Sequence, residues 1–109
     1  MAEEFRSFAA FWPHYLREHR DPRTRGLHYL GTSLGVLLLA GFLATGDWRL
    51  LIGAPIAGYA FAWFAHAFIE HNRPATFTHP LWSLIGDFRM LWCWATGRLR
   101  TELARSRSA

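Results

Sequence analysis

The side chains of this 109-residue chain that could carry chemistry are its six histidines and the charged residues near them. Three of the histidines lie between residues 65 and 80, where a long apolar segment runs into a polar one, and Glu70 and Arg73 lie in the same stretch. Ionisable groups at the edge of an apolar segment are costly to bury, and they are often functional. This stretch is therefore a candidate functional site.

Four histidines are predicted to lie at one depth. His28 lies just inside the first apolar run and His66 just before the end of the second. Antiparallel runs rising about 1.5 Å per residue would bring the two to the same level. His19 ends the preceding helix and His79 begins the following one. Because imidazole binds Fe, Zn, Cu and Ni, this layer predicts a metal site. Glu70, four residues after His66, is the predicted catalytic residue, either as a carboxylate ligand or as a group that orients an imidazole.

A second interpretation treats the histidines as polar residues at a membrane boundary, which is what we expect of His14 and His71. The protein would then be a non-enzymatic membrane scaffold or assembly protein. A haem-binding membrane subunit is a third possibility, with His28 and His66 as axial ligands. The spacing of the histidines leaves all three open.

Two uncharged runs, residues 27–45 and 50–69, are each long enough to cross a bilayer. Only a few residues separate them, so they are predicted to form an antiparallel hairpin in an all-α integral membrane bundle. Gly31 and Gly35 are spaced to let the two helices approach closely. The single Cys93 excludes an internal disulfide and is predicted to be a small buried residue.

An amphipathic helix is predicted over residues 3–19, with Pro13 kinking or dividing it. Residues 20–25 are predicted to form a turn, with Thr24 as the N-cap of the next helix. The apolar face of the first helix comprises Phe5, Phe8, Trp12, Tyr15 and His19.

A third apolar segment, residues 81–96, is shorter and has Asp87 and Arg89 at its centre. We expect an in-plane or re-entrant helix, and a tilted span is the alternative. Residues 1–97 are predicted to form one membrane domain, followed by a frayed Arg/Ser-rich tail over residues 98–109. The apolar stripe of the third segment comprises Leu81, Leu84, Phe88, Leu91 and Ala95.

The positive charge of the chain, formally +4, comes from arginines alone. They flank the apolar runs and form no single basic face, which favours a membrane over nucleic acid as the partner. Their excess before residue 27 and after residue 97 predicts that the N-terminus is cytoplasmic.

Several strings, taken together over residues 5–95, resemble the family of the fungal 2-hydroxy fatty acid dioxygenase, which includes short bacterial members. These strings are FWPHYL (11–16), EH (18–19), RGLHYLGT (25–32), HAFIE (66–70), NRPA (72–75) and HPLWS (79–83).

The resemblance implies an iron(II)-dependent membrane enzyme that uses O₂ to remove one carbon from 2-hydroxy fatty acids. The family's recurrent histidines match His19, His28 and His66, and its Glu-x-x-x-Pro-Ala element begins at Glu70. His79 would be shared only within the short branch. As a short bacterial member, the protein is expected in a bacterial inner membrane. Thr24 departs from the family, where asparagine is common.

The substrate would be held from both ends. The carboxylate and α-hydroxyl of a 2-hydroxy acid can chelate one iron, and the acyl tail would stay in hydrocarbon. Arg73 or Arg25 is expected to hold the carboxylate. The acyl-chain preference and the oligomeric state are left open.

Overall fold

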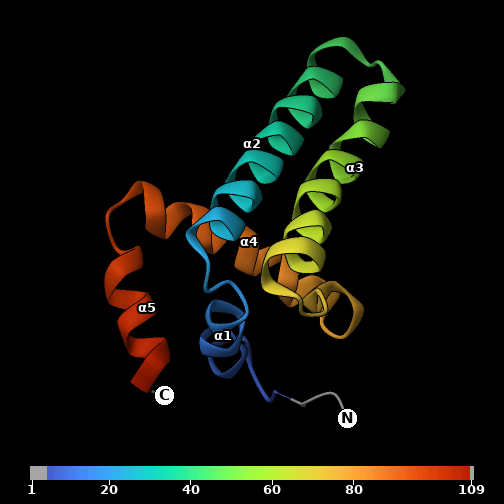
Figure 1. Ribbon diagram of the computed structural model, residues 1–109. Helices are drawn as coiled ribbons and strands as arrows, with labels where there is room; N and C mark the ends of the chain where they lie inside the picture. Colours follow the sequence, from blue (N-terminus) through green and yellow to red (C-terminus); the bar gives the residue numbers. More distant parts are fainter. Residues whose placement is uncertain (1–4, 109) are drawn as a thin grey trace.

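The computed structural model describes residues 5–108, which contain five α-helices and no strand. Two long helices form an antiparallel hairpin, and the other helices gather at its base (Figure 1). This architecture confirms the predicted all-α bundle with a two-helix hairpin. The elements are α1 (Phe8–Arg17), α2 (Pro22–Thr45), α3 (Trp48–Ala65), the π-helical turn η1 (His66–Glu70), the 3₁₀ turn η2 (Ala75–Phe77), α4 (Pro80–Ala95) and α5 (Leu99–Ser108).

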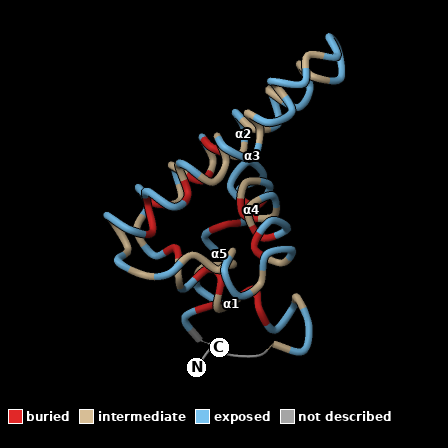
Figure 2. The backbone as a smooth tube through the Cα atoms, turned by 90° about the vertical axis from the view of Figure 1, so that its right-hand side faces the viewer, coloured by how far each residue is buried: buried red, intermediate tan, exposed pale blue. Residues whose placement is uncertain are grey.

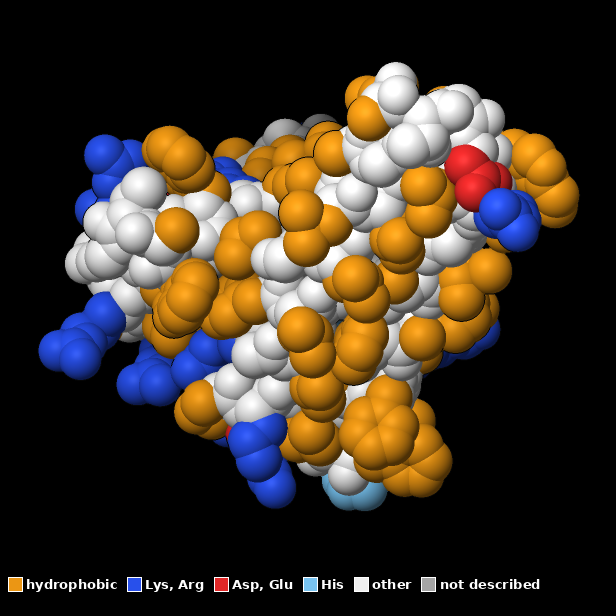
Figure 3. All heavy atoms as spheres, turned by 90° about the horizontal axis from the view of Figure 1, so that it is seen from above, with side chains coloured by type: hydrophobic (Ala, Val, Ile, Leu, Met, Phe, Trp, Pro, Cys, Tyr) orange, Lys and Arg blue, Asp and Glu red, His pale blue; other side chains and the backbone are white. Residues whose placement is uncertain are grey.

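The hairpin is long and apolar enough to cross a membrane. Its first helix has 24 residues, about 36 Å at 1.5 Å per residue, against a hydrocarbon core of about 30 Å. Most of its side chains are uncovered, and Leu37 and Leu43 are 68% and 75% exposed. Burial is concentrated at the base (Figure 2). Seen from the hairpin tip, hydrophobic side chains cover much of the surface and arginines project at the edges (Figure 3). An apolar surface of this kind suits lipid, because water-soluble domains rarely leave large apolar patches exposed.

Small residues hold α2 and α3 together. A Cβ added at Gly31 would lie 3.0 Å from the Cβ of Phe61, and one at Gly35 would lie 3.0 Å from the carbonyl oxygen of Ala54. The predicted close approach at these two glycines is therefore confirmed.

The first helix of the hairpin begins earlier than predicted. The Asp21 side chain accepts a hydrogen bond from the backbone N–H of Arg23, and Pro22 occupies the first turn, where its missing N–H leaves no helical bond unmade. Thr24 is buried inside α2, so its prediction as the N-cap was wrong. The turn predicted over residues 20–25 consequently ends at Asp21.

The amphipathic helix α1 is shorter than the predicted range of 3–19, of which residues 3 and 4 lie outside the described part. Ser7 caps it by accepting from the backbone N–H of Ala10. Pro13 lies inside the helix and does not divide it. Of the predicted apolar face, Trp12, Tyr15 and His19 are buried, and Phe5 and Phe8 are partly buried against the core.

The apolar core lies at the base of the hairpin, between α1, α4 and α5. Phe11, Tyr15 and Leu16 of α1 pack there with buried residues of the other two helices. Cys93 is one of these residues, as predicted. Gly86 makes room for the packing, because a Cβ there would lie 2.8 Å from the Tyr15 ring.

The third apolar segment forms α4, which crosses beneath the hairpin (Figure 1). Its inward face carries Ser83, Gly86, Met90 and Cys93. Most of the apolar stripe predicted from the sequence faces outward instead, with Leu81 65% exposed. An outward apolar face on a helix across the base fits the expected in-plane helix.

The tail was predicted to fray, and that prediction was wrong. It forms α5, because Leu99 is buried and the Arg17 guanidinium donates a hydrogen bond of 3.0 Å to the carbonyl of Ser106. Arg89 of α4 pairs with Glu102 at 3.2 Å. The division of the chain into a domain and a tail at residue 97 stays a prediction.

Candidate metal centre

Three of the four predicted histidines meet at the base of the hairpin. His19 follows α1, His28 lies in the second turn of α2, and His66 opens η1. All three are buried, and their candidate ligand atoms lie within 4.8 Å of one another. Their ring centroids are separated by 4.4, 4.6 and 5.1 Å, with the rings nearly perpendicular. Three imidazoles from three elements thus surround one point and could hold a metal ion.

Each imidazole is anchored through its Nδ1 atom by an oxygen acceptor. The Nδ1 of His19 lies 2.5 Å from the carbonyl oxygen of Tyr15, and that of His28 lies 3.1 Å from Asp87 Oδ1. The Nδ1 of His66 lies 2.6 Å from Asn72 Oδ1. A carbonyl or carboxylate oxygen can only accept, so each Nδ1 carries the hydrogen. The Nε2 atom of every neutral ring is then left with a free lone pair.

The Nε2 atoms that remain face inward. Those of His19 and His66 lie 3.2 Å apart, and the buried Nε2 of His28 has no hydrogen-bond partner among the described residues. Two lone pairs facing each other inside a protein are unfavourable unless a proton or a cation lies between them. The separation is less than twice a metal–imidazole distance of about 2.1 Å, so one ion can contact both nitrogens. The donor set therefore fits a metal.

Burial favours the neutral form of the His19 ring. Loss of hydration, followed by the nearby His28 and His66 rings, lowers the pKa of His19 well below 6.5. Burial, and then the Asp87 carboxylate, raises the pKa of the Tyr15 hydroxyl well above 10. Tyr15 thus stays protonated and donates a hydrogen bond to Asp87.

Sequence reasoning missed the residues that orient the imidazoles. Asp87 accepts from both Tyr15 and His28, and the Tyr15 ring stacks on His19 with centroids 4.1 Å apart. Asn72 accepts from His66 while its amide donates to the carbonyl and carboxylate of Glu18. A carboxylate in the middle of an apolar helix was the one available signal for Asp87.

His79 is not part of the histidine group. It stacks on Trp82 with centroids 5.6 Å apart, and its Nδ1 lies 2.9 Å from the Thr78 hydroxyl. Its ring also contacts Phe5 and Phe11. The expectation that four histidines converge is therefore met by three, because the 3₁₀ turn and the start of α4 direct His79 toward α1.

The predicted charged residues lie around the group, outside the set of converging nitrogens. Glu70 accepts a hydrogen bond of 2.7 Å from the backbone N–H of Asp21 and so joins η1 to the turn that follows His19. Arg25 donates to the carbonyls of His19 and Arg20. The catalytic and substrate-binding roles of Glu70 and Arg25 stay predictions.

Three further residues considered in the sequence analysis lie in the loop after η1 and in α1. Arg73, also predicted to bind substrate, is exposed and lies over the Phe77 ring. His71 is exposed, and His14 is half-buried 3.7 Å from Glu18. Neither histidine joins the group of three.

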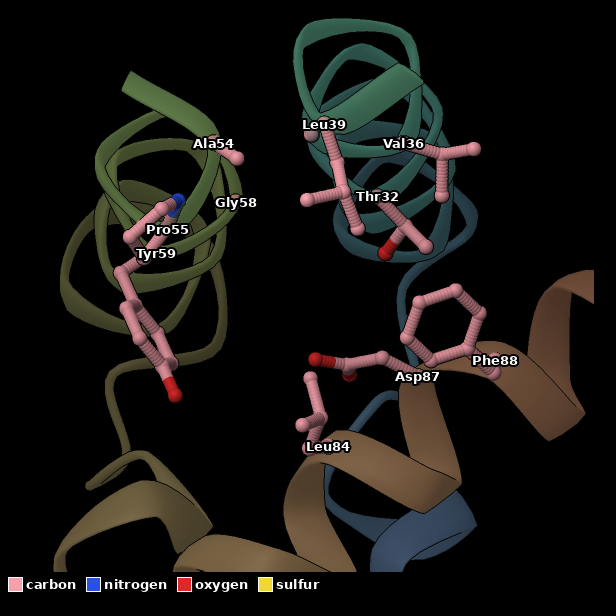
Figure 4. A pocket seen from close by; sticks show the side chains of 12 residues that line it. Thr32, Val36, Leu39, Ala54, Pro55, Gly58, Tyr59, Leu84, Asp87 and Phe88 are labelled. Atoms are coloured by element: carbon pink, nitrogen blue, oxygen red, sulfur yellow. The ribbon is translucent and has the colours of Figure 1, made fainter. Parts of the chain in front are cut away.

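A mainly apolar cavity of about 310 Å³ lies between α2, α3 and α4. Asp87 points from α4 toward the gap between the two hairpin helices, beside Leu84 and Phe88 (Figure 4). Gly58 and Tyr59 of α3 line the opposite side (Figure 4). The cavity thus ends at the carboxylate that anchors His28.

The family model described as 2-hydroxy-palmitic acid dioxygenase Mpo1-like matches residues 5–99. The chain belongs to the Mpo1-like family. The match covers all three converging histidines, together with Asn72 and Asp87, and it confirms the family predicted from the sequence strings. The chain matches no curated protein and no solved structure. The family's printed name indicates a dioxygenase, and in this Mpo1-like chain the buried histidines are the group that could hold a metal for such chemistry.

Proposed function

We propose that the protein is an iron(II)-dependent dioxygenase that removes one carbon from 2-hydroxy fatty acids at a membrane. The observation that carries the proposal is the convergence of three Nε2 lone pairs from His19, His28 and His66 in a buried space. Each ring is fixed by an oxygen on its other nitrogen, as is usual for metal-binding histidines.

The proposed chemistry requires a redox-active metal. Zinc has no redox chemistry, so it cannot by itself support the use of O₂. Iron is favoured by the resemblance of this chain to the dioxygenase family, and it is compatible with imidazole ligands. When bound, iron(II) would supply electrons for the reduction of O₂ and open positions for the oxygens of a 2-hydroxy acid. Three histidines leave such positions open.

The residues of this chain hold and orient the ligands. Each histidine ring keeps its hydrogen on Nδ1 because an oxygen of Asp87, Asn72 or the Tyr15 carbonyl accepts from it. The Nε2 lone pairs are thereby directed inward. The apolar wall of the cavity can exclude water and contact an acyl tail, with Asp87 marking its polar end. In this proposal Glu70 fixes the turn after His19, and Arg25 or Arg73 holds the substrate carboxylate.

The overall reaction balances with O₂ as the only oxidant. A 2-hydroxy acid and O₂ give the acid shortened by one carbon, CO₂ and water, with the C1–C2 bond broken. The two hairpin helices are long and apolar enough to cross a membrane. Because the substrate is amphiphilic, its tail can stay in the lipid beside them. We propose a bacterial inner membrane with the base of the hairpin on the cytoplasmic side, because arginines are concentrated there.

The haem alternative is disfavoured by the arrangement of the rings. Two axial imidazoles need a flat gap for the porphyrin between them, whereas here three rings meet edge to face around one point. A scaffold without a metal would leave the inward lone pairs of His19 and His66 facing each other.

Oxygen uptake tests the proposal. Protein purified without oxygen and supplied with iron(II) should consume O₂ with 2-hydroxypalmitate and yield the C15 acid, but not with palmitate, which lacks the hydroxyl group. His66→Ala should abolish the uptake, whereas His71→Ala, which changes an exposed neighbour, should retain it. If folded, iron-supplied wild-type protein consumes no O₂ with any 2-hydroxy fatty acid, or if His66→Ala is as active as wild type, the proposal fails.

A further inference from the structure

A second concave site lies away from the histidines, between α1, the turn after it and α5. It has a volume of about 580 Å³. We call it the basic cleft, and it is defined by Arg17, Arg20, Arg25 and Arg107 with an apolar wall of Leu16 and Leu103. No acidic side chain of residues 5–108 lines it. Four guanidinium groups around one hollow repel one another, so this arrangement favours a bound anion.

The arginines of the cleft are not neutralised within the described chain. Among the residues that the structure describes, ion pairs are formed by four other arginines, Arg23, Arg49, Arg89 and Arg105, and none of them lines the cleft. Arg17 donates to the carbonyl of Ser106, and Arg25 donates to two carbonyls beside α1. These bonds fix two guanidinium groups through one nitrogen each. Because a guanidinium has five N–H donors, others remain available to a ligand.

The cleft lies at the base of the molecule, next to the start of α2. Arg20 and Arg25 flank the first residue of that helix, and α5 runs beside α1 on the same side (Figure 1). With the hairpin placed in a membrane, this level corresponds to the lipid headgroups. Basic hollows beside membrane helices at this depth favour phosphate-bearing headgroups.

We propose that the basic cleft binds the phosphate group of an anionic lipid headgroup. Arginine forks match the oxygens of a phosphate, and more than one fork can bind the same group. Leu103, which is partly exposed at the apolar wall, can contact the glycerol end of the lipid. The site lies beyond the proposed dioxygenase activity, and of its four arginines only Arg25 is also a candidate for the substrate carboxylate. The proposal rests only on the membrane placement of α2 and α3.

Native mass spectrometry of the purified protein in a neutral detergent tests this proposal. Phosphatidylglycerol is titrated against phosphatidylcholine, and inorganic pyrophosphate is added in a separate arm. The test variant is Arg20→Ala/Arg107→Ala, which removes two exposed side chains that form no hydrogen bond or ion pair with another described residue. The matched control is Arg6→Ala/Arg98→Ala, which removes the same charge from exposed positions outside the cleft. Thermal unfolding shows that each variant is folded.

We expect one phosphatidylglycerol per chain to bind in preference to phosphatidylcholine. The test variant should weaken this binding by about 10- to 30-fold, as expected for two arginines at a membrane surface, and the control should change it little. Equal loss in both variants would show a general charge effect and overturn the proposal, as would equal binding of the two lipids. Pyrophosphate that binds alone and displaces the lipid completely would identify a soluble phosphate as the ligand and overturn the lipid assignment. Iron content is measured on the same samples, so failure of lipid binding is distinguishable from failure of the metal site.

Discussion

The two ends of the α2–α3 hairpin begin their helices in the same way and differ in everything around them. Asp21 and Asp47 each cap a helix by accepting from the backbone of the arginine two residues later. Each also pairs with that arginine's guanidinium at 2.8 Å. At the tip, the backbone N–H of Asp47 donates to the neighbouring Thr45 hydroxyl. At the base, the backbone N–H of Asp21 donates to Glu70, 49 positions away.

This contrast separates what a local sequence determines from what packing adds. An Asp-x-Arg cap forms at either end because its contacts are all within three residues. The base becomes a candidate site because α1, η1 and α4 cover it and bring three imidazoles into one buried space. The tip remains uncovered, with a side-chain surface suited to lipid.

The largest expected effect is on membrane insertion of the hairpin. Leu37→Arg places a charge near the middle of α2, where the side chain is 68% exposed. Insertion should become less favourable by about 2.5 to 3.5 kcal/mol if lipid surrounds this position. Alkaline extraction of membranes measures the fraction inserted. Thr101→Arg, which adds the same charge to the exposed surface of α5, is the control and should leave the fraction unchanged. Equal insertion of Leu37→Arg would show that this surface does not meet lipid.

A pair of aspartates at opposite ends sharpens the contrast at the site. Asp87→Asn replaces the carboxylate that accepts from His28 and Tyr15, and it should lower iron affinity by about 10- to 100-fold. Asp47→Asn makes the same chemical change at the tip and should leave the affinity unaltered. Competition with a metal-sensitive chelator measures both. An unchanged iron affinity in Asp87→Asn would show that the carboxylate does not support the metal site.

Substitution of two helical glycines tests how tightly the helices pack at the base and near the tip of the hairpin. Gly86→Ala would place a Cβ 2.8 Å from the Tyr15 ring, whereas Gly53→Ala would place one at an ordinary 3.6 Å from Leu38. The first change should lower the free energy of unfolding by about 1 to 2 kcal/mol and reduce iron binding. The second should be neutral or slightly stabilising, because alanine favours helix. Thermal unfolding in detergent measures both, and a harmless Gly86→Ala would contradict the packing described at the base.

The smallest expected effect is the pH dependence of the cap at the tip. A hydrogen bond from the Arg49 side chain, followed by one from its backbone, lowers the pKa of Asp47 below 3.8. The carboxylate therefore stabilises the fold above its unfolded pKa, and this contribution is lost as the pH falls through the lowered folded value. Asp47→Asn should unfold slightly earlier than wild type at pH 6, and the difference should shrink toward pH 3. A difference that grows in acid would have the wrong sign.

The hairpin and the histidine triad followed from the sequence for simple reasons. Uncharged runs of this length need a nonpolar environment, and a short connection makes them antiparallel, which brings His28 near His66. The orienting residues did not follow, because Asp87 and Asn72 act through contacts that depend on how α4 crosses the base and how η1 ends. The helix α5 was not predicted from the sequence because arginines dominate that segment. Leu99 and Leu103 are its apolar contacts with the core, too few to reveal a helical period.

Metal analysis of protein purified without oxygen is the most direct test that the base of the hairpin is a metal centre. Wild-type protein and His71→Ala should each hold one iron ion per chain, and neither should show a haem spectrum. His66→Ala should hold none while keeping its thermal unfolding transition, because its loss removes one of three converging nitrogens. A folded wild-type protein that takes up no iron when it is supplied, or a His66→Ala variant that retains it in full, would contradict the metal centre.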